Sequence, residues 1–352
     1  MKSFFIGNLE VKLPVIQGGM GVGVSLSGLA SAVANEGGIG VISCAGLGLI
    51  YHKSHGDYLS KCISGLKEEI QKAREKSKGI IGVNIMVALT NYADMVKTSI
   101  AEKVDVIFAG AGLPFDLPSF LAGNSKTKLV PIVSSSRAAK IICDKWKNNY
   151  GYLPDAIVVE GPKAGGHLGF KVNQLEDEQY SLEHLIPEVV SIANSYKDEK
   201  KIPVIAAGGI SSGKDILHFI EMGASGVQMG TLFVTTNECD ASDTFKNVFI
   251  NAKKEDIKII QSPVGMPGRA LRNSFIERVR DGREKITGCF NCLKACNPAT
   301  ADYCITQALI DAVNGDRENG LFFCGARIGE ISEMTTVKDL IDELSGRGAV
   351  SL

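Results

Sequence analysis

The stretches 203-PVIAAGGI-210 and 226-GVQMGT-231 decide the fold of this chain. Each is a short and almost wholly apolar run followed by glycine, as is typical of a parallel strand that is buried on both faces. A helical pattern, Lys214–Glu221, lies between them. Two such strands joined through a helix form a right-handed crossover unit, so the sequence predicts a parallel sheet here.

The same unit recurs along most of the chain. Eight segments have the pattern of buried strands: Leu13–Gln17, Gly40–Ser43, Ile80–Asn84, Val104–Ala109, Leu129–Ser134, Ala156–Glu160, Pro203–Ala207 and Gly226–Met229. Helical patterns separate them, among them Ser27–Asn35, Leu59–Lys76, Ser136–Asn148 and Leu182–Tyr196. Eight units favour an α/β fold of the closed (β/α)8 (TIM) barrel type over a doubly wound sheet, although periodicity alone carries no information on closure.

The pattern changes after the eighth strand. Helices are expected near Phe245–Ala252, Asn273–Val279, Gln307–Asn314 and Val337–Leu344, with a cysteine-rich segment among them. We therefore expect residues 1–237 to form the barrel and residues 238–352 to form a helical extension that packs on it.

Composition narrows the class of protein. The net charge of −1 gives no basic field that would favour nucleic acid or an anionic membrane. No segment approaches the ~18 apolar residues that are needed to span a bilayer, and the start of the chain lacks a signal-peptide core. We expect a soluble cytoplasmic protein with neither nucleic acid nor a membrane as partner.

Glycine follows most of the predicted strands, and in barrels of this type the loops after the strands carry the functional groups. The loops begin with Gly18-Gly19-Met20, Gly110-Ala111, Gly161 to Gly169, Gly208-Gly209 and Gly230-Thr231. Glycine lets the backbone approach a ligand closely, and the last two loops match the phosphate position of the fold. Barrel turns need glycine in any case, but five such loops together favour a phosphate-bearing ligand.

His167 is the candidate catalytic base. It lies in the loop after the sixth strand, among Gly165, Gly166 and Gly169, with little local bulk to cover it. Its ordinary pKa suits proton transfer near neutrality, although a loop histidine is often structural. Glu160 ends the same strand and either orients the histidine or a ligand hydroxyl, or is a satisfied strand-end carboxylate.

Two further polar positions follow strands. Asn84 closes the third strand inside an apolar run, and its amide needs a partner that a flavin ring edge or a backbone turn would supply. Ser134, Ser135 and Ser136 follow the fifth strand. They are ligand contacts or a helix N-cap, and Ser136 is the expected cap.

Four of the nine cysteines lie within a short segment: Cys289, Cys292, Cys296 and Cys304. Four thiolates can hold zinc or a [4Fe–4S] cluster. Structural zinc sites usually have two separated pairs, so the single compact run favours iron–sulfur, with zinc or free thiols as alternatives. Cys324 is a further neighbour that the spacing does not require.

The glycine motifs, taken in order, resemble those of a known superfamily. Ile16–Gly21, Gly37–Gly40, Gly165–His167 and Ala207–Ile210 are similar to the nitronate monooxygenase (2-nitropropane dioxygenase) superfamily, which also contains FMN-dependent enoyl-ACP reductases. This resemblance runs from Val11 to Arg272.

A narrower resemblance covers nearly the whole chain. It rests on Gly110–Pro114, Glu160–Pro162, Gly166–Phe170, Ser262–Gly265 and the cysteine segment. Together these are similar to the iron–sulfur flavoproteins that dehydrogenate and isomerise decanoyl-ACP, although the cysteine spacing here is shorter than in that branch.

The resemblance implies FMN at the barrel mouth and His167 as the base. The positions that would contact the cofactor are Gly18, Gly19, Met20, Asn84, Gly110, Ala111, Ser134, Glu160, Gly165, Gly166, Gly208, Gly209, Gly230 and Thr231. The metal ligands would be the four cysteines. The first hypothesis is dehydrogenation and isomerisation of an acyl thioester on a carrier protein in fatty-acid metabolism.

Three alternatives remain open. A nitronate monooxygenase acting on a small molecule needs only the barrel, FMN and the base. An NAD(P)H-dependent enoyl-ACP reductase needs the same parts. A barrel that binds a phosphorylated ligand without redox turnover is a different class. The oligomeric state is also open, a homodimer being one option.

Overall fold

The computed structural model describes residues 1–51, 55–121 and 126–347, and within them eight parallel strands close into a barrel. The strands neighbour one another in the order β10-β11-β3-β4-β5-β6-β7-β8, and β8 closes on β10. Their bounds are β3 Val15–Gln17, β4 Ile39–Ser43, β5 Ile80–Met86, β6 Val106–Gly110, β7 Lys128–Val133, β8 Ile157–Glu160, β10 Val204–Ala207 and β11 Gly226–Met229. The predicted (β/α)8 barrel is therefore confirmed.

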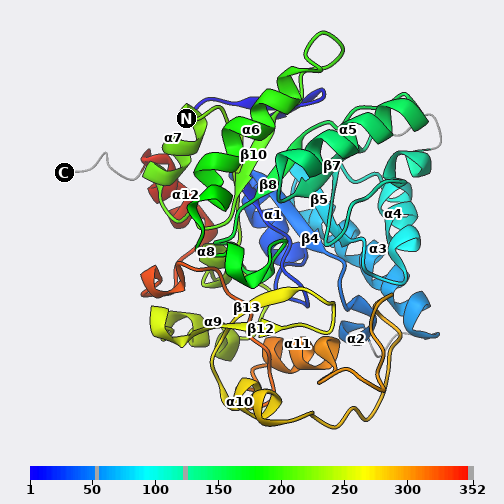
Figure 1. Cartoon of the computed structure of the whole chain (residues 1–352), viewed down its shortest axis with the longest axis vertical. Helices are drawn as coiled ribbons and strands as arrows, with labels where there is room; N and C mark the ends of the chain where they lie inside the picture. Colours follow the sequence, from blue (N-terminus) through cyan, green and yellow to red (C-terminus); the bar gives the residue numbers. More distant parts are fainter. Residues whose placement is uncertain (52–54, 122–125, 348–352) are drawn as a thin grey trace.

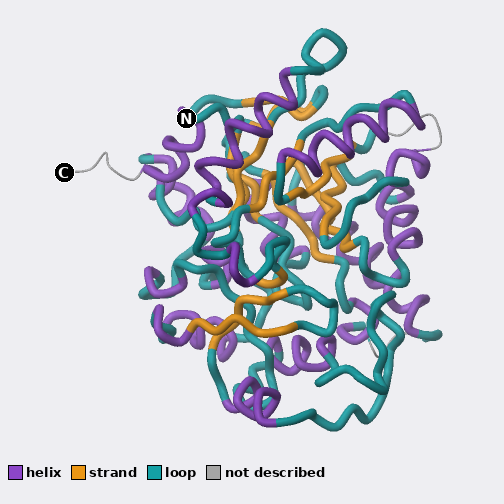
Figure 2. Tube along the Cα trace, viewed as in Figure 1, coloured by secondary structure: helices purple, strands orange, loops and turns teal. Residues whose placement is uncertain are grey.

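Helices surround these strands (Figure 2). Those between or just after the barrel strands are α1 Ser27–Asn35, α2 Leu47–Ile50, α3 Tyr58–Lys76, α4 Tyr92–Ala101, α5 Ser136–Tyr150, α6 Leu182–Asn194, α7 Gly213–Glu221 and α8 Thr231–Val234. Short 3-10 turns lie at Leu117–Leu121, Val172–Gln174, Glu178–Tyr180, Lys254–Asp256 and Ile328–Glu330. The longer helices match the predicted helical patterns closely.

A hairpin of β1 (Phe4–Ile6) and β2 (Leu9–Val11) covers one end of the barrel. Phe4 and Ile6 belong to the same buried cluster as the side chains inside the barrel, such as Phe108 and Val158. The interior is thus a packed core and the N-terminal end is plugged. We therefore expect the ligand site at the opposite end of the barrel, where the C-terminal ends of the strands lie.

The C-terminal extension contains both helices and strands. Its elements are α9 Asp243–Ile250, β12 Ile257–Gln261, β13 Pro267–Leu271, α10 Ser274–Asp281, α11 Ile305–Val313 and α12 Val337–Ser345. The first five gather below the barrel in Figure 1, whereas α12 returns along α1 and α7. The expectation of a purely helical extension is thus corrected by the β12–β13 hairpin.

The hairpin pairs with a strand of the barrel half of the chain. β13 is antiparallel to β9 (Gly166–His167), with Gly268 opposite His167 and Arg269 opposite Gly166. Leu168 N–H also donates to the Pro267 carbonyl oxygen at 2.8 Å. Main-chain hydrogen bonds therefore join the extension to the loop that carries the candidate base. The division at residue 237 stays a prediction.

Candidate active site

A large cavity of about 620 Å³ lies over the C-terminal ends of the barrel strands. All eight strands send residues to it, which are Gly18, Ser43, Asn84, Gly110, Val133, Glu160, Ala207 and Met229 or their immediate neighbours. Its volume is in the range of sites that enclose a cofactor or drug-sized ligand. The predicted ligand loops are therefore brought together in space.

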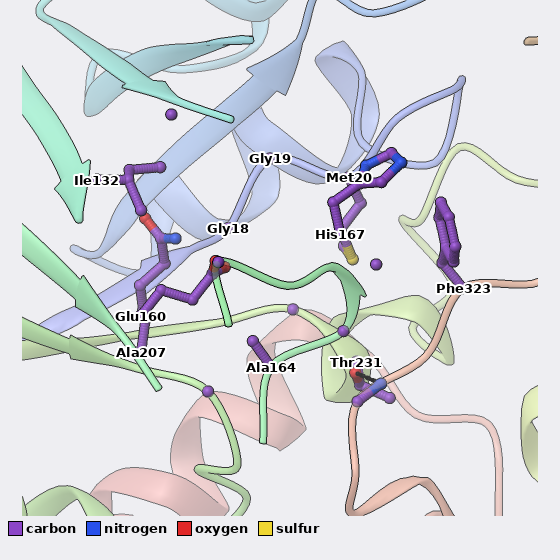
Figure 3. A pocket seen from close by; sticks show the side chains of 18 of the residues that line it. Gly18, Gly19, Met20, Ile132, Glu160, Ala164, His167, Ala207, Thr231 and Phe323 are labelled. Atoms are coloured by element: carbon purple, nitrogen blue, oxygen red, sulfur yellow. Dashed lines mark hydrogen bonds between the residues drawn. The ribbon is translucent and has the colours of Figure 1, made fainter. Parts of the chain in front are cut away.

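His167 and Glu160 face this cavity from different sides (Figure 3). The His167 ring lies edge-on to Phe323, with ring centroids 5.0 Å apart, and its Nε2 is 2.8 Å from the Ser262 hydroxyl oxygen. Burial lowers the pKa of His167 to about 4. A neutral imidazole at physiological pH is able to accept a proton, as a general base requires.

Glu160 and Asn84 are polar groups with no side-chain hydrogen bond to any other described residue. Glu160 ends β8 within the cavity, and burial raises its pKa to about 7. Asn84 lies in β5, and a Cβ added at Gly19 would come within 2.2 Å of the Asn84 Cβ atom. Polar groups left without protein partners at a cavity wall are suited to binding a polar ligand.

The predicted phosphate position is formed by the loops after β10 and β11. Gly208 and Gly209 have φ values of +98° and +79°, a conformation that favours glycine. Beside them, Thr231 Oγ1 accepts a hydrogen bond from Gly325 N–H at 3.0 Å, so its own hydrogen remains available for an anion. Both loops line the large cavity.

Other predicted positions are also in the wall. Gly18, Gly19, Met20, Gly110, Ala111, Ser134, Gly165, Gly166 and Gly230 all line the cavity. Ala111 has a φ of +51°, which is uncommon for a residue with a Cβ atom and is found at functional sites. The cap of α5 is Ser135, whose hydroxyl accepts from Ala138 N–H, and not Ser136, which donates to Glu188 instead.

Several residues of the site come from the extension, and the sequence did not predict that they lie at the cavity or beside His167. They are Met266, Phe323, Cys324, Gly325 and Arg327, together with Ser262, which contacts His167. Arg327 donates to Asp215 at 2.6 Å and to the Gly209 carbonyl oxygen at 3.4 Å. No local pattern marks them, because their role depends on pairing with loops about a hundred residues away.

The four clustered cysteines line a second, small cavity of about 20 Å³. Within residues 1–51, 55–121 and 126–347, however, no three His, Cys, Asp or Glu side chains are placed so that they hold a metal ion. Cys292 Sγ is instead 3.0 Å from Thr306 Oγ1. The predicted metal site is thus not formed as a ligand set. Cys324 lies in the wall of the large cavity, apart from these four.

The segment around these cysteines is held by other groups. Arg283 donates to the carbonyl oxygens of Ala299 and Ala301, each at 2.6 Å, and to that of Pro298. Thr90 N–H donates to the Cys292 carbonyl oxygen at 3.1 Å. These contacts fix the backbone without requiring the thiols to converge.

Comparison with known proteins identifies the family. The family model described as nitronate monooxygenase matches residues 2–346. The chain belongs to the nitronate monooxygenase family. A probable nitronate monooxygenase from Staphylococcus aureus (strain Newman) is 29% identical over 309 residues, which is 77% of this chain and 78% of that protein.

Solved structures agree with this assignment. FabK from Thermotoga maritima is 29% identical, with a TM-score of 0.74 over 96% of this chain and 94% of FabK. A nitroalkane oxidase from Streptomyces ansochromogenes is 21% identical, with a TM-score of 0.72 over 96% of this chain and 98% of that one, and shows the shared fold. This chain is an oxidoreductase of the FMN-dependent nitronate monooxygenase-like superfamily.

The residues present fit FMN. The cavity is large enough, the loops after β10 and β11 provide glycine backbone and a hydroxyl for a phosphate, and Asn84 and Glu160 offer polar groups without partners.

Within the described part of the chain, no helix is both long and apolar enough to cross a membrane.

Thr231→Val tests the phosphate position. Loss of the hydroxyl removes a hydrogen bond to a charged group, so we expect the Kd for FMN to rise by about 10-fold or more. Quenching of flavin fluorescence measures the affinity, and Thr231→Ser should restore it.

Thr235→Val is the matched control, because Thr235 bonds to the Leu232 carbonyl oxygen within the same turn and does not line the cavity. An unchanged Kd in Thr231→Val would remove this residue from the phosphate site.

Proposed function

We propose that this protein dehydrogenates an acyl thioester, with FMN as the oxidant and His167 as the base, and then shifts the new double bond. The observation that supports the proposal is a group of six apolar side chains among the residues that line the large cavity. We call it the apolar arm, and its residues are Val24, Val234, Phe245, Phe249, Leu309 and Leu321.

The apolar arm joins the barrel to the extension. Val24 comes from the loop after β3 and Val234 from α8, while Phe245 and Phe249 come from α9 and Leu309 from α11. Phe245, Phe249 and Leu321 are almost completely buried. An aliphatic chain placed here would gain roughly 0.8 kcal/mol for each CH₂ group removed from water. A small nitroalkane would leave this volume unused.

The site residues account for the first half of the reaction. The thioester carbonyl acidifies the α-carbon, whose proton passes to the neutral His167. FMN, when bound, supplies the acceptor for the hydride that leaves the β-carbon. The α–β bond becomes double, so the product is a 2-enoyl thioester, and the two electrons removed from the substrate reduce the flavin.

Isomerisation needs only the same base. After it has released the α-proton to solvent, the neutral His167 takes a proton from C4 and returns one to C2, and the double bond moves from C2–C3 to C3–C4. The loop with Ala111 and Gly112, both at positive φ, provides main-chain N–H groups near the cavity for the developing oxyanion. No electron transfer is required in this half.

Leu309→Phe tests the apolar arm. A larger ring at this position shortens the space for the chain, so we expect kcat/KM for a decanoyl thioester to fall by about 10-fold or more, with little change for a butanoyl thioester. Chromatography of the enoyl products measures both rates.

Ile310→Phe is the matched control, since Ile310 is next to Leu309 on α11 but does not line the cavity. Equal losses for the long and the short substrate would contradict the assignment of the arm to an acyl chain.

We further propose that the cysteine segment binds a [4Fe–4S] cluster through Cys289, Cys292, Cys296 and Cys304. All four cysteines are among the residues that line one small cavity. Burial raises the pKa of Cys292, and the nearby thiols of Cys304 and Cys296 raise it further. Thiols that oppose each other's ionisation are stabilised as thiolates by a bound cation, which supports a metal centre here.

Metal analysis tests this proposal. Protein purified without oxygen should contain about four irons per chain, and Cys296→Ser should lose most of them. Cys143→Ser, which changes a buried cysteine of α5 outside the segment, should keep its iron. One zinc per chain without iron, or no metal at all, would contradict the cluster.

A further inference from the structure

Lys163 is a cation in the wall of the large cavity that the proposed reaction does not use. It lies in the loop after β8 and is exposed to solvent. Within residues 1–51, 55–121 and 126–347, its ammonium group has neither a hydrogen bond nor a carboxylate within ion-pair distance. A charged group of a cavity wall that has no protein partner is suited to fixing a charged part of a ligand.

The stem of Lys163 runs along the loop after β10, which is part of the predicted phosphate position. A Cβ atom added at Gly209 would lie 2.7 Å from Lys163 Cβ, 3.4 Å from its Cγ and 3.0 Å from its Cδ. Three successive carbons of the lysine therefore cover Gly209, whose φ of +79° itself favours glycine. The ammonium nitrogen is two bonds beyond Cδ, so it extends from a point directly over this loop.

The main chain of Lys163 is tied to the other half of the phosphate position. Its carbonyl oxygen accepts a hydrogen bond from Ala326 N–H at 3.1 Å. The preceding residue, Gly325, donates its N–H to Thr231 Oγ1 at 3.0 Å. One short segment of the extension thus fixes both the lysine backbone and the hydroxyl that we assign to a phosphate. The lysine side chain consequently starts beside that hydroxyl.

Arg327 is the second cation of the cavity wall, but its charge is already paired. Its Nη1 donates to Asp215 and its Nε donates to Glu330, each at 2.6 Å. Two carboxylates beside one guanidinium leave an excess of negative charge, which repels a phosphate dianion bound nearby. In the described part of the cavity wall, Lys163 is the only other lysine or arginine.

We propose that Lys163 binds the phosphate group of FMN and supplies the positive charge that balances it. The backbone at Gly208 and Gly209 and the Thr231 hydroxyl would fix the phosphate through hydrogen bonds, and the lysine would act on it as a point charge. This inference concerns the cofactor alone, so it goes beyond the proposed acyl-thioester reaction and does not depend on it.

Lys163→Met removes the charge and keeps the stem. We expect the Kd for FMN to rise by about 5-fold in about 0.01 M salt, and the difference from the unmodified chain to vanish in about 1 M salt, where screening is nearly complete. Quenching of flavin fluorescence on flavin-depleted protein measures both values. An unchanged Kd at low salt, or a loss that salt does not reduce, would overturn the proposal.

Riboflavin separates the phosphate from the rest of the cofactor, because it is FMN without that group. We expect the Kd of Lys163→Met for riboflavin to stay within about 2-fold of that of the unmodified chain. For FMN, Lys163→Arg should restore the affinity and Lys163→Glu should weaken it more than Lys163→Met does. Equal losses for the two flavins would overturn the proposal, since the lysine would then act on the loop or on another part of the cofactor.

Lys171→Met is the matched control. Lys171 is another exposed lysine between β8 and β10, and it does not line the cavity. This variant should bind FMN as the unmodified chain does. A loss equal to that in Lys163→Met would show that the net charge of the protein decides the affinity, and it would overturn the proposal.

The ³¹P NMR signal of bound FMN gives a reading besides affinity. It reports the charge and the hydrogen bonds of the phosphate, so we expect it to move in Lys163→Met and to stay in Lys171→Met. A second source of phosphate is the carrier arm of the thioester substrate. If Lys163→Met leaves the FMN signal and the Kd unchanged but raises KM for a coenzyme A thioester and not for the matching pantetheine thioester, the assignment to FMN is overturned.

Discussion

The pairing of β9 with β13 is the contact on which the site depends. It joins Gly166 and His167 of the barrel half to Gly268 and Arg269 of the extension, about a hundred residues later. Arg269 is buried and donates to the Ala164 carbonyl oxygen, so the same strand also fixes the start of the histidine loop. Without this pairing, the glycine-rich loop that carries His167 would lose the main-chain hydrogen bonds that fix it over the cavity.

The extension then closes the rest of the cavity. Gly325 N–H bonds to Thr231, and Ala326 N–H bonds to the Lys163 carbonyl oxygen at 3.1 Å, so one short segment holds two barrel loops. The cavity wall is therefore shared: the barrel provides most of the polar positions that fit FMN, and the extension provides most of the apolar arm. Burial in this joint site keeps His167 neutral and raises the pKa of Glu160 to about 7. Both effects arise from loss of water around a charged form.

The barrel could be predicted from the sequence because its signals are local. Segments such as Ile80–Asn84 are apolar on both faces, and they end at the loops that the fold uses for ligands. The β12–β13 hairpin was missed because 267-PGRAL-271 has no alternating pattern, and its strand character comes from pairing with β12 on one side and with the distant β9 on the other. Ser262 was named only as part of a family motif, because nothing in its own stretch of sequence predicts a contact with His167. The cysteine spacing indicated a metal centre, but spacing alone does not show whether the backbone brings the thiols together.

The central claim is that one cavity holds the flavin, the base and an acyl chain. Anaerobic bleaching of the bound flavin tests it most directly, with a decanoyl thioester, a nitronate and NADPH compared in parallel as reductants. We predict that the thioester bleaches the flavin and yields one enoyl product per flavin. His167→Ala should keep its FMN and react at least about 100-fold more slowly. Bleaching by the nitronate or by NADPH alone, or an unchanged rate in His167→Ala, would contradict the account.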